Sequence, residues 1–202
     1  MATIESVTLD VPDLVSADRF YTAIGVKDRV RLRQADAPAS GFRGYTLSLT
    51  TAQPGNVDRL LEGALDAGAE TLKPAEKSLW GYGAVVRAPD GSIVTIASSS
   101  SKKDTGAATQ QVDDFVLQLG VADVAASREF YTEHGFTVSK SYGRKYVEFD
   151  SGRVQLTLIS RRSLAKTAGV SPDGTGSHGI AIGTDAAPFT DPDGFEAETA
   201  SG

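Results

Sequence analysis

Hydrophobic and polar residues alternate along the first strand-like stretch of the chain. Residues 4–11 (IESVTLDV) turn apolar side chains to one side and polar side chains to the other. A period of two predicts a half-buried strand. Residues 13–24 then carry apolar side chains at helical spacing, and Gly25 is placed to end that helix in the left-handed conformation.

The same two periodicities continue through the rest of the chain and predict an α+β protein. A second helix is expected over about 56–67, with Asn56 as its N-cap, and a third over 123–134. Asp90 and Asp193 are interpreted as turn residues. Strands are expected at 26–34, 44–51, within 70–98, and at 114–121, 136–141, 144–150, 153–160 and 178–185. Residues 161–176 are basic and then loop-like.

One motif occurs twice. Residues 11–25 (VPDLVSADRFYTAIG) recur as residues 121–135 (VADVAASREFYTEHG), with the same Val, Asp, Phe, Tyr, Thr and Gly at equivalent positions, so Phe20 and Phe130 are expected to be buried equivalents. A second echo joins residues 89–98 (PDGSIVTIAS) to 192–201 (PDGFEAETAS). A repeat of about half the chain length is unlike the short period of a solenoid and predicts a duplicated domain.

The repeat divides the chain into a domain over 1–98, a polar linker over 99–111 and a domain over 112–202. The two copies are shortened differently. The first unit of the first half lacks two strands, and the last unit of the second half has no room for a helix. The sequence leaves open whether these shortened units complete each other.

Composition narrows the function classes. The chain has no cysteine, which excludes disulfides, zinc-thiolate sites, iron–sulfur clusters and a cysteine nucleophile, and agrees with the expected cytoplasmic location. A secretory signal is not expected, because the N-terminus has no basic region followed by an apolar core. A membrane span is not expected, because no apolar run approaches about 20 residues. A net charge of −6 argues against nucleic acid as a partner.

The doubled x-D-L/V-x-x-[AS]-x-x-F-Y helix followed by glycine, together with the doubled P-D-G closure, resembles the vicinal oxygen chelate superfamily. This superfamily includes glyoxalase I, bleomycin-resistance-type proteins, fosfomycin-modifying transferases and extradiol dioxygenases. The resemblance covers nearly the whole chain. It implies tandem glyoxalase-like domains built from βαβββ units, whose mixed sheets curl into cups around a ligand.

The resemblance also implies a divalent metal held by two imidazoles and a carboxylate, which leave open positions for a substrate's oxygens. The implied ligand positions are Ser6 and Val116 on first strands, Gly44 and Ser177 on strands that open the second units, and Thr95 and Glu198 on closing strands. Only Glu198 keeps a ligand type, so no metal site is expected, although a divalent ion is not excluded.

His178 lies one residue from an implied ligand position. A register slip or bulge would bring it into the cup beside Glu198, where the pair would bind a metal weakly or act as acid and base. His178 and Glu198 are therefore the candidate catalytic residues. The alternative is a histidine at the end of a strand with no role in chemistry.

Aromatic residues and polar cup positions are the candidates for ligand binding. Aromatic walls stack on flat ligands, although plain core packing explains aromatics equally well. The expected ligand contacts are Trp80, Tyr82, Thr95, Gln118, Tyr142 and Tyr146.

Three functions remain open. The first is a metal-independent protein that binds or sequesters a small, aromatic or amphipathic molecule, as bleomycin-resistance-type proteins do. The second is a metal-dependent lyase, isomerase or extradiol-type dioxygenase. The third is a structural or regulatory duplicate without a small ligand. A small molecule is the expected partner, and a second copy of the chain is left open.

Overall fold

The computed structural model describes residues 1–37, 39–78, 81–98 and 103–200, and these form an α+β fold. The first half of the chain holds β1 (Ile4–Val11), α1 (Leu14–Ala23), β2 (Val30–Gln34), β3 (Ser40–Gly41), β4 (Tyr45–Thr51), α2 (Pro54–Asp66), β5 (Glu70–Ser78), β6 (Gly81–Arg87) and β7 (Ile93–Ser98). The second half holds β8 (Asp114–Val121), α3 (Val124–Glu133), β9 (Thr137–Ser141), β10 (Tyr146–Asp150), β11 (Gln155–Ser160), α4 (Arg161–Ala168), β12 (Gly174–Thr175), β13 (Ile180–Thr184), β14 (Phe189–Thr190) and β15 (Glu196–Thr199).

The larger sheet joins the two halves of the chain. Its eight strands run in the order β5-β6-β7-β4-β8-β11-β10-β9. The junction is the antiparallel pair β4–β8, in which Leu47 lies opposite Leu117. The second unit of the first half and the first unit of the second half therefore build one sheet.

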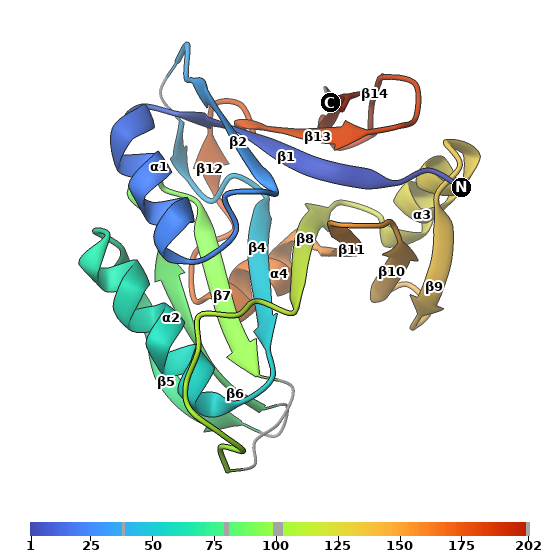
Figure 1. Ribbon diagram of the computed structural model, residues 1–202. Helices are drawn as coiled ribbons and strands as arrows, with labels where there is room; N and C mark the ends of the chain where they lie inside the picture. Colours follow the sequence, from blue (N-terminus) through green and yellow to red (C-terminus); the bar gives the residue numbers. More distant parts are fainter. Residues whose placement is uncertain (38, 79–80, 99–102, 201–202) are drawn as a thin grey trace.

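The smaller sheet joins the two ends of the chain. Its order is β14-β15-β13-β1-β2, with β1 antiparallel to β13 and parallel to β2 (Figure 1). An unpaired edge strand exposes a row of N–H and C=O groups, which pairing with the other short unit removes. The two shortened units thus complete each other. The short pair β12–β3 forms a third sheet.

One hydrophobic core lies between the two large sheets and the helices. It contains alternating residues of central strands, such as Leu9, Leu49 and Leu117, together with the helix residues Phe20 and Tyr131. α1 and α3 begin in the same way, because Asp13 and Asp123 each accept hydrogen bonds from two backbone N–H groups of the first turn. The repeated motif therefore repeats local structure as well as sequence.

The start of α2 differs from the prediction. Gln53, rather than Asn56, is the N-cap, and Pro54 occupies the first helical turn. Asn56 lies inside the helix, where its side chain is buried and donates to Thr51 Oγ1 at 3.0 Å. Asn56 Oδ1 and Gln53 Oε1 also accept backbone N–H groups of the segment after β7, including that of Thr109. Part of the predicted linker is thus tied to this helix.

The prediction of a loop over 161–176 is wrong at its beginning, because residues 161–168 form α4. Ser160 caps the helix, its hydroxyl accepting from the Ser163 N–H, and Gly169 ends it in the left-handed conformation with a φ of 80°. Its sequence is mostly polar, because only Leu164, Ala165 and Ala168 of this short helix are buried. Ser160 and Gly169 were the signals that could have predicted it.

Phe130 is less buried than Phe20. Phe20 has no exposed surface, whereas Phe130 is partly exposed and packs against the core. The prediction that the two are buried equivalents is therefore wrong for Phe130. α1 packs beside α2, whereas Phe130 on α3 meets the short β14, whose Phe189 ring lies 5.5 Å from its own.

None of the helices in the described parts of the chain is both long and apolar enough to cross a bilayer.

Candidate functional site

The eight-stranded sheet has a face that is turned away from the main core, and its middle carries one row of side chains. The row crosses the four central strands: Ser48 on β4 is paired with Thr95 on β7 and with Val116 on β8, and Val116 is paired with Gln155 on β11. All four side chains are half-buried. We call these four residues the central row. It contains Thr95 and Val116, two of the metal positions implied by the family resemblance.

α4 lies on this same face of the sheet, and α2 covers the other (Figure 1). Leu164 approaches Gly120 of β8 so closely that a Cβ there would lie 3.3 Å from its Cδ2 atom. Lys73 Nζ donates to the carbonyl oxygens of Lys166 and Thr167, at 3.4 and 2.5 Å, and so caps the end of the helix. The apolar contact under α4 consists of Leu164, Ala165 and Ala168 against Phe42, Val85 and Ile93.

A cavity of about 340 Å³ opens beside α4 and over β5, β6 and β7. Its residues are mostly small or apolar: Lys73, Pro74, Glu76, Ser78, Gly81, Tyr82, Gly83, Ala84, Val85, Thr95, Ala97 and Thr167. A Cβ at Gly83 would come within 2.8 Å of the Ile96 carbonyl oxygen and 3.1 Å of Ala97 Cβ. Glycine is thus required at this position, and the cavity wall stays flat there.

Of the predicted ligand contacts, Thr95 lines this cavity, with its side chain on the face that carries the central row. Tyr82 also borders it, but its hydroxyl donates to Asp58 Oδ1 on α2 at 2.7 Å. This hydrogen bond raises the pKa of Tyr82 to about 12. Tyr82 pairs with Ser98 and Val85 pairs with Thr95, so alternation directs Tyr82 and Thr95 to opposite faces. Trp80 lies outside the described residues.

Gln118, Tyr142 and Tyr146 lie toward the other end of the sheet. Gln118 Oε1 accepts from Thr46 Oγ1 at 2.9 Å. The Tyr146 hydroxyl donates to Glu148 Oε2 at 2.9 Å, and burial together with this hydrogen bond raises its pKa. Tyr142 is 59% exposed, with its ring 6.0 Å from that of Tyr146.

Glu148 and Thr157 extend this polar region and were not predicted. They are paired across β10 and β11, beside Gln118 of β8. Thr157 Oγ1 is buried and has no hydrogen-bond partner among the described residues. The alternation that places Glu148 on the same face as Tyr146 was readable in residues 144–150.

His178 and Glu198 have separate surroundings. His178 precedes β13, with its Nδ1 atom 2.6 Å from the Arg43 carbonyl oxygen and its Nε2 atom 2.9 Å from that of Asp193. Its ring stacks on Phe195. Glu198 lies on the five-stranded sheet, where it accepts from Thr8 Oγ1 at 2.6 Å. Both ring nitrogens of His178 therefore face backbone oxygens rather than a cup or Glu198.

The residues at the implied metal positions do not fit a metal. Gly44 precedes β4, so the strand register places Ser48, not Gly44, beside Thr95. Hydroxyls, a valine and an amide are poor replacements for imidazole and carboxylate ligands. In the five-stranded sheet the corresponding row is Ser6, Gly183 and Glu198. Within the described ranges, no three His, Asp or Glu side chains lie together as metal ligands.

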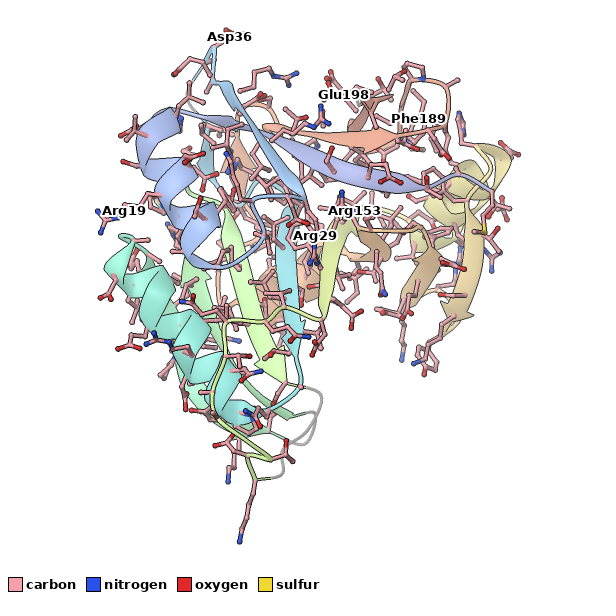
Figure 2. All side chains as sticks on the ribbon, viewed as in Figure 1. Arg19, Arg29, Asp36, Arg153, Phe189 and Glu198 are labelled. Atoms are coloured by element: carbon pink, nitrogen blue, oxygen red, sulfur yellow. The ribbon has the colours of Figure 1, made fainter. Side chains whose placement is uncertain are left out.

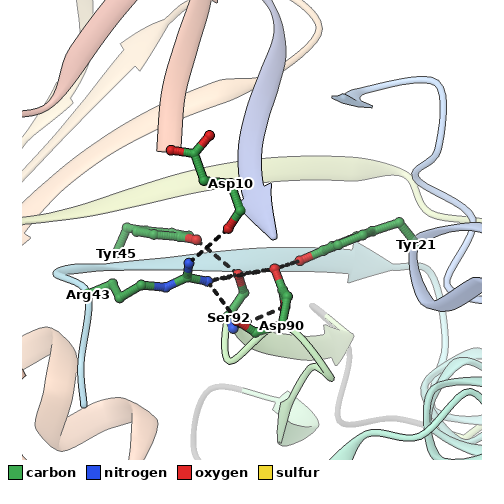
Figure 3. Close-up of polar contacts among 6 residues, drawn as sticks. All are labelled: Asp10, Tyr21, Arg43, Tyr45, Asp90 and Ser92. Carbon is green, nitrogen blue, oxygen red and sulfur yellow. Dashed lines mark hydrogen bonds and ion pairs between the residues drawn. The ribbon is translucent and has the colours of Figure 1, made fainter. Parts of the chain in front are cut away.

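A buried charged network connects the two sheets (Figure 3). Arg43 donates to Ser92 Oγ at 2.6 Å and to the backbone oxygen of Asp10 on β1 at 3.4 Å. Its guanidinium lies 3.6 Å from the Asp90 carboxylate, and the two side chains are 9% and 1% exposed. The Tyr21 hydroxyl donates to the same carboxylate at 3.1 Å. Asp90 thus organises a turn and anchors this network.

The second repeat contains a related contact. The Tyr131 hydroxyl donates to Asp191 Oδ2 at 2.9 Å. Burial raises the pKa of Tyr21 and of Tyr131, and in each case the adjacent carboxylate raises it further. Burial also raises the pKa of Asp191. A tyrosine of each repeated helix, α1 and α3, therefore ties that helix to the turn before the last strand of another unit.

Solved structures with the same arrangement identify the fold. Maize glyoxalase I superposes with a TM-score of 0.62 over 98% of this chain and 91% of its own, at 15% sequence identity. The chain has a glyoxalase-like fold. A candidate dioxygenase from Bacillus subtilis superposes with a TM-score of 0.53 over 89% of this chain and 69% of its own, at 12% identity. No protein-family model and no curated protein sequence matches the chain.

Proposed function

We propose that the protein is a metal-independent binding or sequestering protein for a small, flat, largely apolar molecule, as was expected from the sequence. The observation that carries the proposal is the central row. In a glyoxalase-like cup these positions face the ligand, and here they are Thr95, Ser48, Val116 and Gln155. They offer hydrogen bonds and apolar contact instead of metal ligation.

The cavity beside α4 suits such a ligand. Its volume of about 340 Å³ lies at the lower end of the usual range for small-molecule sites, about 300–1,000 Å³. Gly83 and Ala97 form a wall on which a ring can lie flat, and Val85 and Pro74 add apolar area. Thr95 supplies a neutral hydroxyl that can donate to a carbonyl or accept from a phenol.

Metal content tests the proposal directly. The protein purified without chelator is expected to carry well under one equivalent of divalent ion. Because a ligand that binds the native state raises its stability by mass action, neither chelator nor added Zn, Ni, Fe or Mn is expected to shift the melting temperature. Elemental analysis and thermal melts check this. Stoichiometric metal with a chelator-sensitive melt would instead support the metal-dependent lyase, isomerase or dioxygenase.

Ligand binding is tested with a thermal-shift screen of aromatic metabolites and antibiotics, followed by titration of tryptophan fluorescence. Trp80 is the only tryptophan and adjoins Gly81 in the sequence. A bound aromatic compound is expected to change its fluorescence, and Trp80→Phe should weaken binding by about 0.5–1.5 kcal/mol if the ring stacks on the ligand.

Thr95→Val tests the contribution of the cavity itself. The substitution keeps the shape and removes the hydroxyl, so affinity for a hydrogen-bonding ligand should fall by about 0.5–1.5 kcal/mol. Thr71→Val, at an exposed position of β5 outside the cavity lining, is the matched control and should leave affinity unchanged. If both variants bind like the parent, the ligand does not use this cavity.

A further inference from the structure

A second hollow, of about 300 Å³, lies away from α4, where the loop before β2 meets the first residues of β8 and β11. Three distant segments of the chain build it. The residues that line it are Asp28, Arg29, Asp113, Asp114, Phe115, Gly152, Arg153 and Gln155. We call it the junction groove. Figure 2 shows two of its residues, Arg29 and Arg153, side by side at the junction of the two sheets.

The two arginines share one carboxylate. Arg153 donates to Asp28 Oδ2 at 2.7 Å, and Arg29 Nε lies 3.6 Å from the same oxygen. The side chain of Arg29 is 18% exposed, and this is its one ion pair within the described residues. A guanidinium has five N–H donors, and leaving them unpaired in a mostly buried position is costly. This part of the groove therefore has one positive charge in excess and free donors.

The acidic part of the groove has the opposite imbalance. Asp113 accepts a hydrogen bond from the Gln111 amide at 3.0 Å, which leaves its charge in place. The half-buried Asp114 carboxylate has no hydrogen-bond or ion-pair partner among the described residues. Carboxylates attract ammonium groups, and two of them here have no cation between them.

From this arrangement we propose that the junction groove binds a small zwitterion, with its carboxylate at Arg29 and Arg153 and its ammonium at Asp113 and Asp114. A simple anion would meet repulsion from the two aspartates, and a simple cation would meet repulsion from the two arginines. A molecule with both charges satisfies both ends. This groove shares no lining residue with the cavity beside α4, although Gln155 of the central row also borders it.

The test is an amide-shift NMR titration of the whole protein with 6-aminohexanoate, and with hexanoate and hexylammonium as singly charged analogues. The zwitterion should shift amides of residues 28–29, 113–115 and 152–155 and bind at least about tenfold more tightly than either analogue, since each analogue lacks the charge-assisted hydrogen bonds of one end. Equal binding of hexanoate or of hexylammonium, or shifts confined to other residues, would overturn the proposal, as would no shift at all.

Substitutions at one exposed and one half-buried position test which charged groups of the groove hold the ligand. Arg153→Gln and Asp114→Asn each remove one charge and keep a polar side chain, and each should weaken the binding of 6-aminohexanoate by about tenfold, for the same reason. Arg128→Gln, on the exposed surface of α3, is the control and should not change affinity. Thermal melts confirm that the variants fold. Unchanged affinity in Arg153→Gln and Asp114→Asn would show that the shifts arise without the proposed charge contacts.

Discussion

Arg43→Met is expected to lower the free energy of unfolding by about 3–5 kcal/mol, because it leaves Asp90 buried without its cationic partner. The Asp90 side chain is 1% exposed, so water cannot replace the guanidinium. Arg43 also donates to Ser92 and to the backbone of β1, so the variant loses a contact between the two sheets. Urea unfolding measures the change.

Two further variants make this result specific. Arg33→Met breaks the ion pair between Arg33 and Asp10, whose side chains are 49% and 25% exposed, respectively. This change should lower the free energy of unfolding by only about 0–1 kcal/mol. Adding Asp90→Asn to Arg43→Met removes the stranded charge and should restore part of the lost stability. A loss at Arg43 no larger than the loss at Arg33 would show that the buried network does not stabilise the fold.

Phe20→Ala is expected to cost about 3–5 kcal/mol, the usual penalty for deleting a fully buried ring. Phe20 has no exposed surface, and its ring packs edge-on against Tyr21 at 5.1 Å between centroids. The resulting cavity would lie in the core shared by both sheets, where neighbouring side chains are fixed on several sides. Thermal or urea unfolding gives the magnitude.

Phe130→Ala is the matched comparison, since Phe130 occupies the same position of the repeated motif. Its partial exposure means that less area is lost to water and less cavity is left, so the expected cost is about 1–3 kcal/mol. The centroid of its ring lies 4.1 Å from that of His134 and 5.5 Å from that of Phe189. At this partly exposed position, these neighbours can move into the space that the ring leaves. Equal losses for the two variants would contradict the asymmetry between the first and last units.

The periodicity of the chain was enough to predict most elements and the orientation of their faces. The strand predicted over residues 114–121 coincides with β8, and its alternation correctly directs Phe115, Leu117 and Leu119 into the core. The repeated helices α1 and α3 begin at the predicted aspartates. These features depend on neighbours within a few residues, so the local sequence contains the information for them.

The candidate site was predicted in part. Thr95 lies on β7 and on the face that carries the central row, as its place in the sequence predicted, and its contact with a ligand stays a prediction. Because the sheet register was unknown, Gly44 was taken as the metal position of β4, whereas the pairing of β4 with β7 places Ser48, four residues later, opposite Thr95. Ser48 and Gln155 joined the row only when the pairing of four strands from both halves was known.

By itself, the sequence determined the repeated units, the alternation that separates core from cup, and the residue types at the cup positions. The tertiary structure alone decided that the two shortened units complete each other, that α4 covers part of the sheet face that carries the central row, and that Arg43 and Asp90 form a buried pair. The physical reason is the separation along the sequence between the residues that interact. Periodicity specifies which side of an element is apolar, but it does not specify the element that covers it, because contacts such as β1–β13 and Thr8–Glu198 join residues from opposite ends of the chain.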